Sequence, residues 1–191
     1  MIYKTIIDNA DLANRNQAHK KVHKVMHDSD EHVACPPFFV SGDTITVQSS
    51  TKPKMAGVAT TELAMPTEGK PVRLKVLLAA VKRSDKRMLL AFTGGTEVNG
   101  KIKNGRLDEA YMVSYLTNRF AEFGLTQAGH IACSYKGALE DPNHNVRKFP
   151  ICELDGCWNF SSTEQLEKLL LTKVGRLNYL GLGMVRIVPQ W

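Results

Sequence analysis

The chain has 191 residues, of which 43% are hydrophobic and 23% charged, a balance typical of folded globular proteins that excludes extensive disorder. Its net charge of +6 and pI of about 9.2 favour a polyanionic partner. No apolar run approaches the roughly 18 to 20 residues that span a bilayer, and the N-terminus lacks the features of a secretory signal. A cytoplasmic protein without membrane association is therefore expected.

The first part of the chain predicts a strand, a helix, a hairpin and a further strand. Residues 2–7 are β-branched and apolar on both faces, which predicts a central strand. Residues 14–27 contain neither Gly nor Pro and predict a helix. Two β-rich runs joined by "SGD" predict a hairpin within residues 38–50. Residues 50–70 are expected to form a loop with at most one helical turn, and residues 71–84 a strong strand.

A connection rich in Gly, Lys and Asn, at about residues 84–106, separates the two halves. Beyond it, the expected elements are a helix ending at Gly124, two strands, a helix capped by Ser162 with Gln165 or by Ser161 with Glu164, and a terminal strand. This order predicts an α+β fold of two tandem ferredoxin-like domains with antiparallel sheets. The expected domains are residues 1–85 and 86–191.

Cys35, Cys133, Cys152 and Cys157 are irregularly spaced and form no CxxC pair. In a chain without a secretory signal, this spacing predicts buried free thiols rather than a zinc site or disulfides.

Three histidines lie four residues apart on the predicted first helix: His19, His23 and His27. The apolar positions Ala18, Val22, Val25 and Met26 form its buried stripe, which places His19 at the edge of the stripe and His27 largely in solvent. Three readings compete. The histidines are ordinary surface residues, or His19 and His23 bind a metal ion, or one imidazole acts as a general acid or base beside a bound polyanion.

Three glycines lie between the last helix and the terminal strand: Gly175, Gly181 and Gly183. Glycine permits positive φ and close approach of backbone N–H groups to a phosphate. Arg176 could bind a phosphate or a guanine edge, and Asn178 and Tyr179 could contact bases. The alternative is a plain helix-to-strand turn with close packing.

The terminal "GRxxxxGxGMVRIVP", preceded by "FPICELDGCWNFSS", resembles the end of the CasE-type CRISPR endoribonucleases, the type I-E repeat-processing enzymes of the RAMP superfamily. "NRNQAH" places Asn14 and His19 on the family's "NPYxxH" stretch, and "GDTITVQSSTKP" is similar to its hairpin. Two positions differ, because the family tyrosine is Asn16 here and the lysine common in its Gly-rich loop is Asn178.

The resemblance implies two ferredoxin-like domains and a metal-independent endoribonuclease without a cofactor, which binds the CRISPR repeat hairpin and cuts it by attack of the RNA 2′-OH. The products would be a 2′,3′-cyclic phosphate and a hairpin that stays bound. It implies His19 as general acid or base, with Asn16 beside it, and a site where the first helix and the C-terminal loop converge. CRISPR backbone subunits of a multi-subunit effector complex are the implied protein partners. Candidate RNA-binding residues are Arg147, Lys148, Gly175, Arg176, Asn178, Gly181 and Gly183.

Two alternatives remain. One is a non-catalytic RNA-hairpin-binding subunit, which the substitutions Asn16 and Asn178 favour. The other is a metal hydrolase that uses His19 and His23. A second basic cluster, which could equally be an ordinary solvated surface, comprises Lys82, Arg83, Lys86 and Arg87.

Overall fold

A computed structural model describes residues 1–8, 15–27, 34–84, 87–93, 96–98, 101–103, 106–141 and 147–189 of the protein. Within these residues no helix is both long enough and apolar enough to cross a membrane. Asn14 and Lys86 lie outside the described residues.

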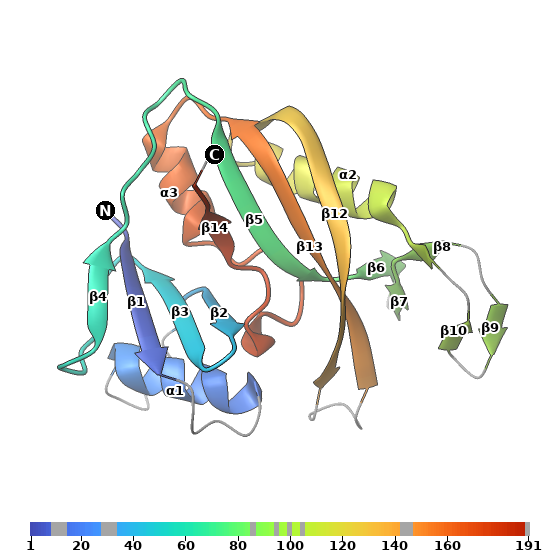
Figure 1. The fold of residues 1–191 in the computed structure, drawn as a ribbon, viewed down its shortest axis with the longest axis horizontal. Coiled ribbons are helices and arrows are strands. Elements are labelled where there is room, and N and C mark those ends of the chain that lie inside the picture. The colour runs from blue at the N-terminus through green and yellow to red at the C-terminus, as the bar shows by residue number, and fades with distance from the viewer. Residues whose placement is uncertain are drawn as a thin grey trace.

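The first unit is a four-stranded antiparallel sheet with one helix against it (Figure 1). Its elements are β1 (Tyr3–Asp8), α1 (Arg15–His27), β2 (Phe38–Ser41), β3 (Thr44–Ser49) and β4 (Ala59–Glu62). The strand order is β2-β3-β1-β4, so the predicted central position of the first strand is confirmed. The hairpin and the first helix are also confirmed. The order matches the ferredoxin-like plan, except that residues 50–58, all described, form no second helix.

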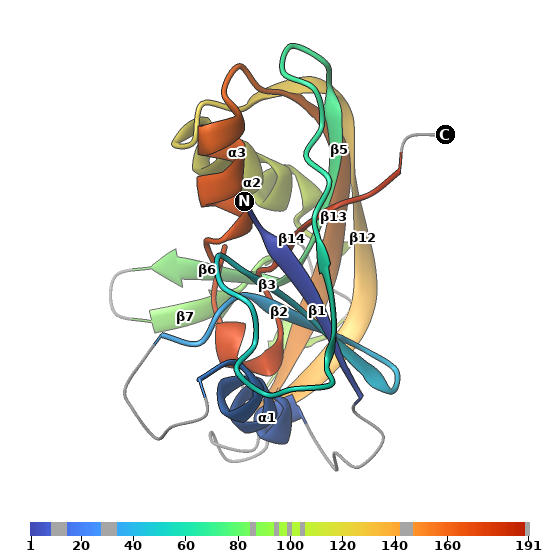
Figure 2. The same ribbon diagram turned by 90° about the vertical axis from the view of Figure 1, so that its left-hand side faces the viewer.

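The second unit has the complete ferredoxin-like order. Its elements are β5 (Val72–Ala79), α2 (Glu109–Ala121), β12 (Thr126–Asp141), β13 (Arg147–Asn159), α3 (Thr163–Leu170) and β14 (Val185–Ile187). They form an antiparallel sheet in the order β12-β13-β5-β14. Both helices cover one face of this sheet and leave the other free of helices (Figure 2).

Among the described residues between β5 and α2, six short strands pair as three small antiparallel ladders, β6-β7, β8-β11 and β9-β10. They are β6 (Val81–Ser84), β7 (Arg87–Leu90), β8 (Phe92–Thr93), β9 (Thr96–Val98), β10 (Lys101–Lys103) and β11 (Arg106–Leu107). The stretch interpreted from the sequence as a connection between halves is therefore an insertion within the second unit.

The sheet pairing divides the chain at a different point from the expected residue 85. Strand β5, counted above with the N-terminal half, pairs along its length with β13 and also with β14. Its sequence alternates accordingly, with Leu74 and Val76 in the second core and Arg73 and Lys75 on the opposite face. We therefore propose a domain boundary between β4 and β5, because a strand belongs to the sheet that pairs its backbone.

Two apolar cores fix the units. Ala18, Val22, Val25 and Met26 of α1 pack onto the first sheet, as the helical periodicity predicts. The second core surrounds Trp158, whose ring centroid lies 4.5 Å from that of Phe120. N-cap side chains stabilise the first turns of both helices of this unit. Asp108 accepts from the Tyr111 N–H at 3.1 Å, and Ser162 accepts from the Gln165 N–H at 3.4 Å. Ser162 is thus the cap of the last helix.

Candidate active site at the junction of the two units

His19 lies on α1 at the edge of the first core, half-buried, as its position beside the apolar stripe predicts. Its ring centroid is 6.3 Å from that of Phe38 on β2, so the core limits the positions of the imidazole on one side. Burial lowers the pKa of His19 below its ordinary value, and the charges of Lys173 and His23 lower it further. The neutral imidazole, which can accept a proton, is therefore favoured near neutral pH.

The segment after α3 crosses from the second unit to α1. It contains a short 3₁₀ helix, η1 (Asn178–Leu180), which packs against α1. A Cβ on Gly181 would lie 3.0 Å from both the Phe38 ring and Val40, so this segment also contacts β2 directly. The structure thus brings the first helix and the Gly-rich segment together, although they belong to different units.

Internal hydrogen bonds occupy the amides of two of the three glycines. Gly183 donates its N–H to the Leu77 carbonyl at 2.9 Å, and Gly181 donates to the Asn178 carbonyl at 3.1 Å. The Gly175 backbone lies near the Tyr115 side chain and acts to lower the pKa of its phenol. Since Gly181 and Gly183 are also buried, the geometry favours the close-packing alternative for them. They shape the segment rather than present amides to a phosphate.

Gly183 shows why the segment needs glycine. At φ +81°, a Cβ on this residue would lie 2.1 Å from the Val174 carbonyl oxygen. That carbonyl belongs to the residue whose N–H donates to the Gly183 carbonyl at 2.9 Å. The pair clamps the start of the segment to its end. As a result, residues 173–183 form a closed loop at the junction.

Lys173 is the residue at this site that sequence reasoning missed. It is half-buried in the closed loop, and its charge acts on both His19 and Cys35. Burial raises the pKa of the Cys35 thiol, an effect that Lys173 partly offsets. This lysine belongs to no recognisable sequence motif. Its position is set by the next residue, Val174, which is hydrogen-bonded to Gly183. The charge of Lys173 reaches the candidate catalytic imidazole.

Asn178 stands where the resembling family commonly has lysine. Its Oδ1 is buried and has no hydrogen-bond partner within the described residues. The same oxygen lies 2.8 Å from the position that a Cβ on Gly183 would occupy. Asn178 therefore points into the closed loop and supplies no positive charge.

The other two histidines of α1 form a pair whose ring centroids are 5.0 Å apart. The expectation that His27 is largely in solvent is wrong, because its Nε2 is buried and has no hydrogen-bond partner within the described residues. Burial lowers the pKa of His27, and the charges of His23 and Lys54 add to the effect. Among the described residues, no group of three or more His, Cys, Asp or Glu side chains could hold a metal ion.

The remaining predicted RNA-binding residues are more scattered. Arg176 is exposed at the edge of a cavity formed with α2, and Lys148 is exposed at the start of β13. The side chains of Asn16 and Arg147 lie outside the described part of the structure, although their backbones belong to α1 and β13. The same holds for the side chains of Lys82, Arg83 and Arg87, on β6 and β7.

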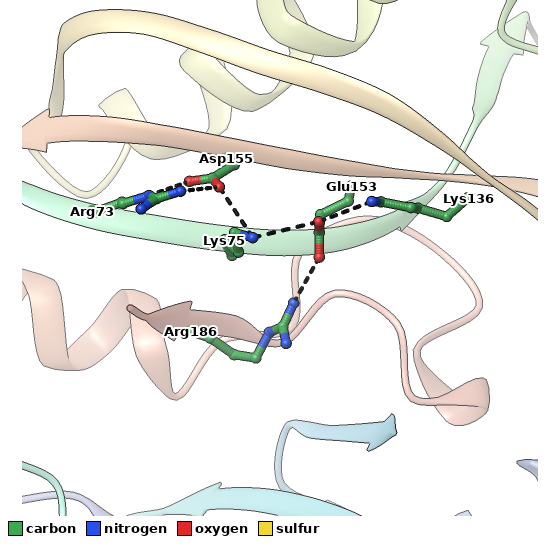
Figure 3. Close-up of polar contacts among 6 residues, drawn as sticks. All are labelled: Arg73, Lys75, Lys136, Glu153, Asp155 and Arg186. Carbon is green, nitrogen blue, oxygen red and sulfur yellow. Dashed lines mark hydrogen bonds and ion pairs between the residues drawn. The ribbon is translucent and has the colours of Figure 1, made fainter. Parts of the chain in front are cut away.

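The helix-free face of the second sheet carries a network of six charged side chains (Figure 3). Arg73 binds Asp155 through two hydrogen bonds of 2.9 and 2.8 Å, which hold the pKa of that carboxyl below its usual range. Lys75 lies 3.1 Å from Asp155 and 3.6 Å from Glu153. Glu153 also pairs with Lys136 at 3.5 Å and with Arg186 at 3.3 Å. Four cations thus surround two carboxylates, so the network is net positive.

Arg186 connects this network to the first unit. Its guanidinium lies 3.8 Å from the centroid of the Phe39 ring on β2, and such stacking of a cation on an aromatic face is favourable. Nearby, Leu77, Ala79, Ile151 and Leu182 form a small apolar cluster with Phe39 packed against it. The two units are therefore joined through β2 on one side and the closed loop on the other.

Two tandem ferredoxin-like units define the class of fold, which is that of CRISPR RNA endoribonucleases of known structure and agrees with the resemblance noted in the sequence. The chain is similar to the CRISPR endoribonuclease Cse3 bound to a 19-nucleotide RNA, with 17% identity, a TM-score of 0.72 and 98% of each chain covered. It is also similar to Cas6e from Escherichia coli K-12, with 16% identity, a TM-score of 0.67 and 100% of each chain covered.

A chain of the E. coli Cascade complex bound to a PAM-containing double-stranded DNA target is a further match, with 14% identity, a TM-score of 0.52, and 98% of this chain and 99% of that one covered. In sequence, the chain matches no protein-family profile and no curated protein. At these identities the likeness establishes the fold.

Proposed function

We propose that the protein is an endoribonuclease that binds the repeat hairpin of a CRISPR RNA precursor and cuts it once without a metal ion. The observation that carries the proposal is the electrostatic effect of Lys173 on His19 at the junction of two units whose fold is that of Cse3 and Cas6e. A basic protein with +6 net charge suits a polyanionic substrate of this kind.

In the proposed reaction, a base removes the proton of the ribose 2′-OH, and the oxygen attacks the adjacent phosphorus. The bond from phosphorus to the 5′-oxygen breaks, and an acid protonates the leaving oxygen. The products are a 2′,3′-cyclic phosphate and a 5′-OH. The half-buried His19, favoured in its neutral form by its surroundings, supplies the base or, once protonated, the acid.

Lys173 takes the electrostatic role in this proposal. Negative charge builds up on the phosphoryl oxygens during the attack, and a fixed cation beside them lowers the barrier. Asn178 carries no charge and faces the interior of the closed loop. Lys173, arriving from the same loop, therefore substitutes for the lysine that the resembling family commonly has at that position. Asn16 remains a proposed neighbour of the reacting phosphate.

RNA affinity in this proposal comes mainly from cations that contact phosphates, because A-form RNA hides its base edges in a deep groove. Arg176 and Lys148 are exposed, and Arg147 precedes Lys148 on β13. The three glycines act through the shape of the loop that carries Arg176. After cleavage the protein would remain on the product hairpin and associate with CRISPR backbone subunits, as the match to a chain of Cascade suggests.

The test is cleavage of labelled CRISPR repeat hairpins in the presence of EDTA. The proposal predicts a product that ends in a 2′,3′-cyclic phosphate and no cutting of a repeat with a 2′-deoxy nucleotide at the scissile position. His19→Ala should lower the cleavage rate by about 10² to 10⁴ and leave affinity unchanged. Cutting of the deoxy substrate, or wild-type speed in His19→Ala, would refute the mechanism.

The alternative is a non-catalytic subunit that binds the same hairpin. The uncharged Asn178 favours it, because the lysine expected at that position is absent. It predicts a stable shift of intact RNA with no product under any condition. Loss of cutting in EDTA would instead favour a metal hydrolase.

A further inference from the structure

A cavity of about 350 Å³ lies between α2 and the start of the closed loop. Its floor includes Leu78 and Met112, each 1% exposed. Tyr111 and Tyr115 of α2 also line it, together with Gly175 and Arg176 of the closed loop. An apolar floor with a few polar groups at the edge is typical of sites that bind small planar molecules, and the volume lies within the usual range of about 300 to 1,000 Å³.

The polar edge of this cavity is ordered before any ligand arrives. Tyr111 and Tyr115 are four residues apart, so they project from the same face of α2. The half-buried position of Tyr115 raises the pKa of its phenol, an effect that the Gly175 backbone and the charge of Arg176 partly offset. Both Tyr115 and Arg176 line the cavity. Two phenol rings and one guanidinium therefore face a common space.

The cavity also lies close to the candidate active site. Lys173 acts electrostatically on His19, and Arg176 follows Lys173 by three residues. Three residues span at most about 11 Å, which along a helical nucleic-acid strand is the length of about three nucleotides. A strand that contacts Lys173 can therefore reach Arg176 at the cavity within a few nucleotides.

We infer that this cavity binds the base of one unpaired nucleotide of the substrate RNA, within about three nucleotides of the cut. A base offers a flat apolar face to the tyrosines, and the adjoining phosphate offers an anion to Arg176. Stacking on aromatic side chains stabilises a bound base by about 1 to 3 kcal/mol and tolerates any base. The inference rests on the proposed function, because it requires an RNA strand at His19.

The test uses repeat RNA with a 2′-deoxy nucleotide at the scissile position, so that only binding is measured. An abasic nucleotide is placed in turn at each of the three positions on either side of the cut. One position should weaken binding to the wild type by about 5- to 150-fold, the loss expected from one stacked base. Tyr111→Leu should weaken binding of intact RNA by a similar factor, with no further loss from the abasic nucleotide.

Tyr135→Ala is the matched control, since this tyrosine is 55% exposed on β12 and its ring contacts Phe92. The control should keep the full abasic effect. Tyr115→Leu, which removes the other ring of the cavity, provides a second variant that should show the same loss of the abasic effect if Tyr111→Leu fails to fold. Equal abasic losses in wild type and variants, or no sensitive position, would overturn the inference while leaving the proposed function intact. Failure of the wild type to bind any repeat hairpin would overturn both.

Discussion

The imidazole of His19 and the ammonium group of Lys173 come from different ferredoxin-like units and interact at the junction between them, where the lysine charge helps to lower the pKa of the histidine. The clamp between Val174 and Gly183 holds Lys173 in this place. In the proposed mechanism, one cation both favours the neutral imidazole and faces the reacting phosphate. The relationship links the candidate catalytic histidine of the first unit to the loop of the second.

Replacing Lys173 by Met should change both the rate and the pH dependence of RNA cleavage. Without the lysine charge the pKa of His19 rises, so the limb of the rate profile that depends on His19 moves to higher pH, whether it acts as base or as acid. The maximal rate should also fall by about 10² to 10³, the usual effect of removing one group that stabilises charge in the transition state. Single-turnover cleavage between pH 5 and 9 measures both effects.

Lys168→Met is the control for this comparison. Lys168 lies on α3, is exposed and pairs with Glu164 one turn away, so its loss removes the same charge at a distance from the junction. An unchanged profile in Lys173→Met, or an equal shift in the control, would show that Lys173 does not act on His19.

Gly183→Ala should destabilise the protein more than any alanine substitution at a solvent-facing glycine. Its Cβ would overlap the Val174 carbonyl, and the backbone must keep a φ of +81°. Left-handed backbone alone costs a non-glycine residue about 1 to 2 kcal/mol, and the overlap adds to it. Urea unfolding followed by circular dichroism should give a loss of more than about 2 kcal/mol.

Two other glycines separate the causes of this loss. Gly69 has a φ of +78° and no atom within 4 Å of an added Cβ. Gly69→Ala therefore measures only the cost of placing alanine in a left-handed backbone conformation. Gly129 has neither a positive φ nor a close neighbour, so Gly129→Ala should leave the free energy of unfolding nearly unchanged. A loss in Gly183→Ala no larger than in Gly69→Ala would contradict the clamp.

The charged network on the helix-free face makes a separate prediction. Glu153 pairs with Lys75, Lys136 and Arg186, and its side chain is 20% exposed. Glu153→Gln keeps the shape but leaves three cations facing one another, which should lower the free energy of unfolding by about 1 to 3 kcal/mol. The loss should shrink as salt is raised, because repulsion between the cations is then screened.

Glu164→Gln serves as the comparison, since its carboxylate is 76% exposed and pairs only with Lys168 among the described ion pairs. A surface pair of this kind contributes little. Thermal unfolding in 50 mM and 500 mM NaCl distinguishes the two variants. If Glu153→Gln is as stable as the wild type at low salt, the network is not a stabilising one.

The sequence predicted the elements that depend on local patterning. The α1 stripe, the hairpin around Gly42 and the cap at Ser162 all follow from periodicity or turn chemistry, and all are present. Strand β4 was missed, because its four residues are mostly exposed and lie in a stretch without a steady period. Short edge strands carry little apolar signal of their own.

What the sequence could not supply is the pairing between distant segments. Strand β5 has the same pattern whichever sheet takes it, and only its register with β13 assigns it to the second unit. Lys173 gave no signal for the same reason, since its importance arises from the loop closure at Gly183. His19, in contrast, could be proposed from the sequence, because its position relative to the apolar stripe and its flanking residues are both local.

Protonation of the partly buried His27 should make the protein less stable in mild acid. Burial lowers the pKa of His27 in the folded state below its ordinary value of 6.5, so below that pH the unfolded chain binds more protons than the folded one. Stability therefore falls as the pH drops through 6.5 and levels off below the folded-state pKa.

His27→Gln removes this contribution, so the melting temperature of the variant should fall less than that of the wild type between pH 7.5 and 5.5. His130→Gln, at an exposed position of β12, should keep the wild-type pH dependence. Parallel curves for wild type and His27→Gln would mean that His27 is as accessible to protons in the folded protein as in the unfolded chain.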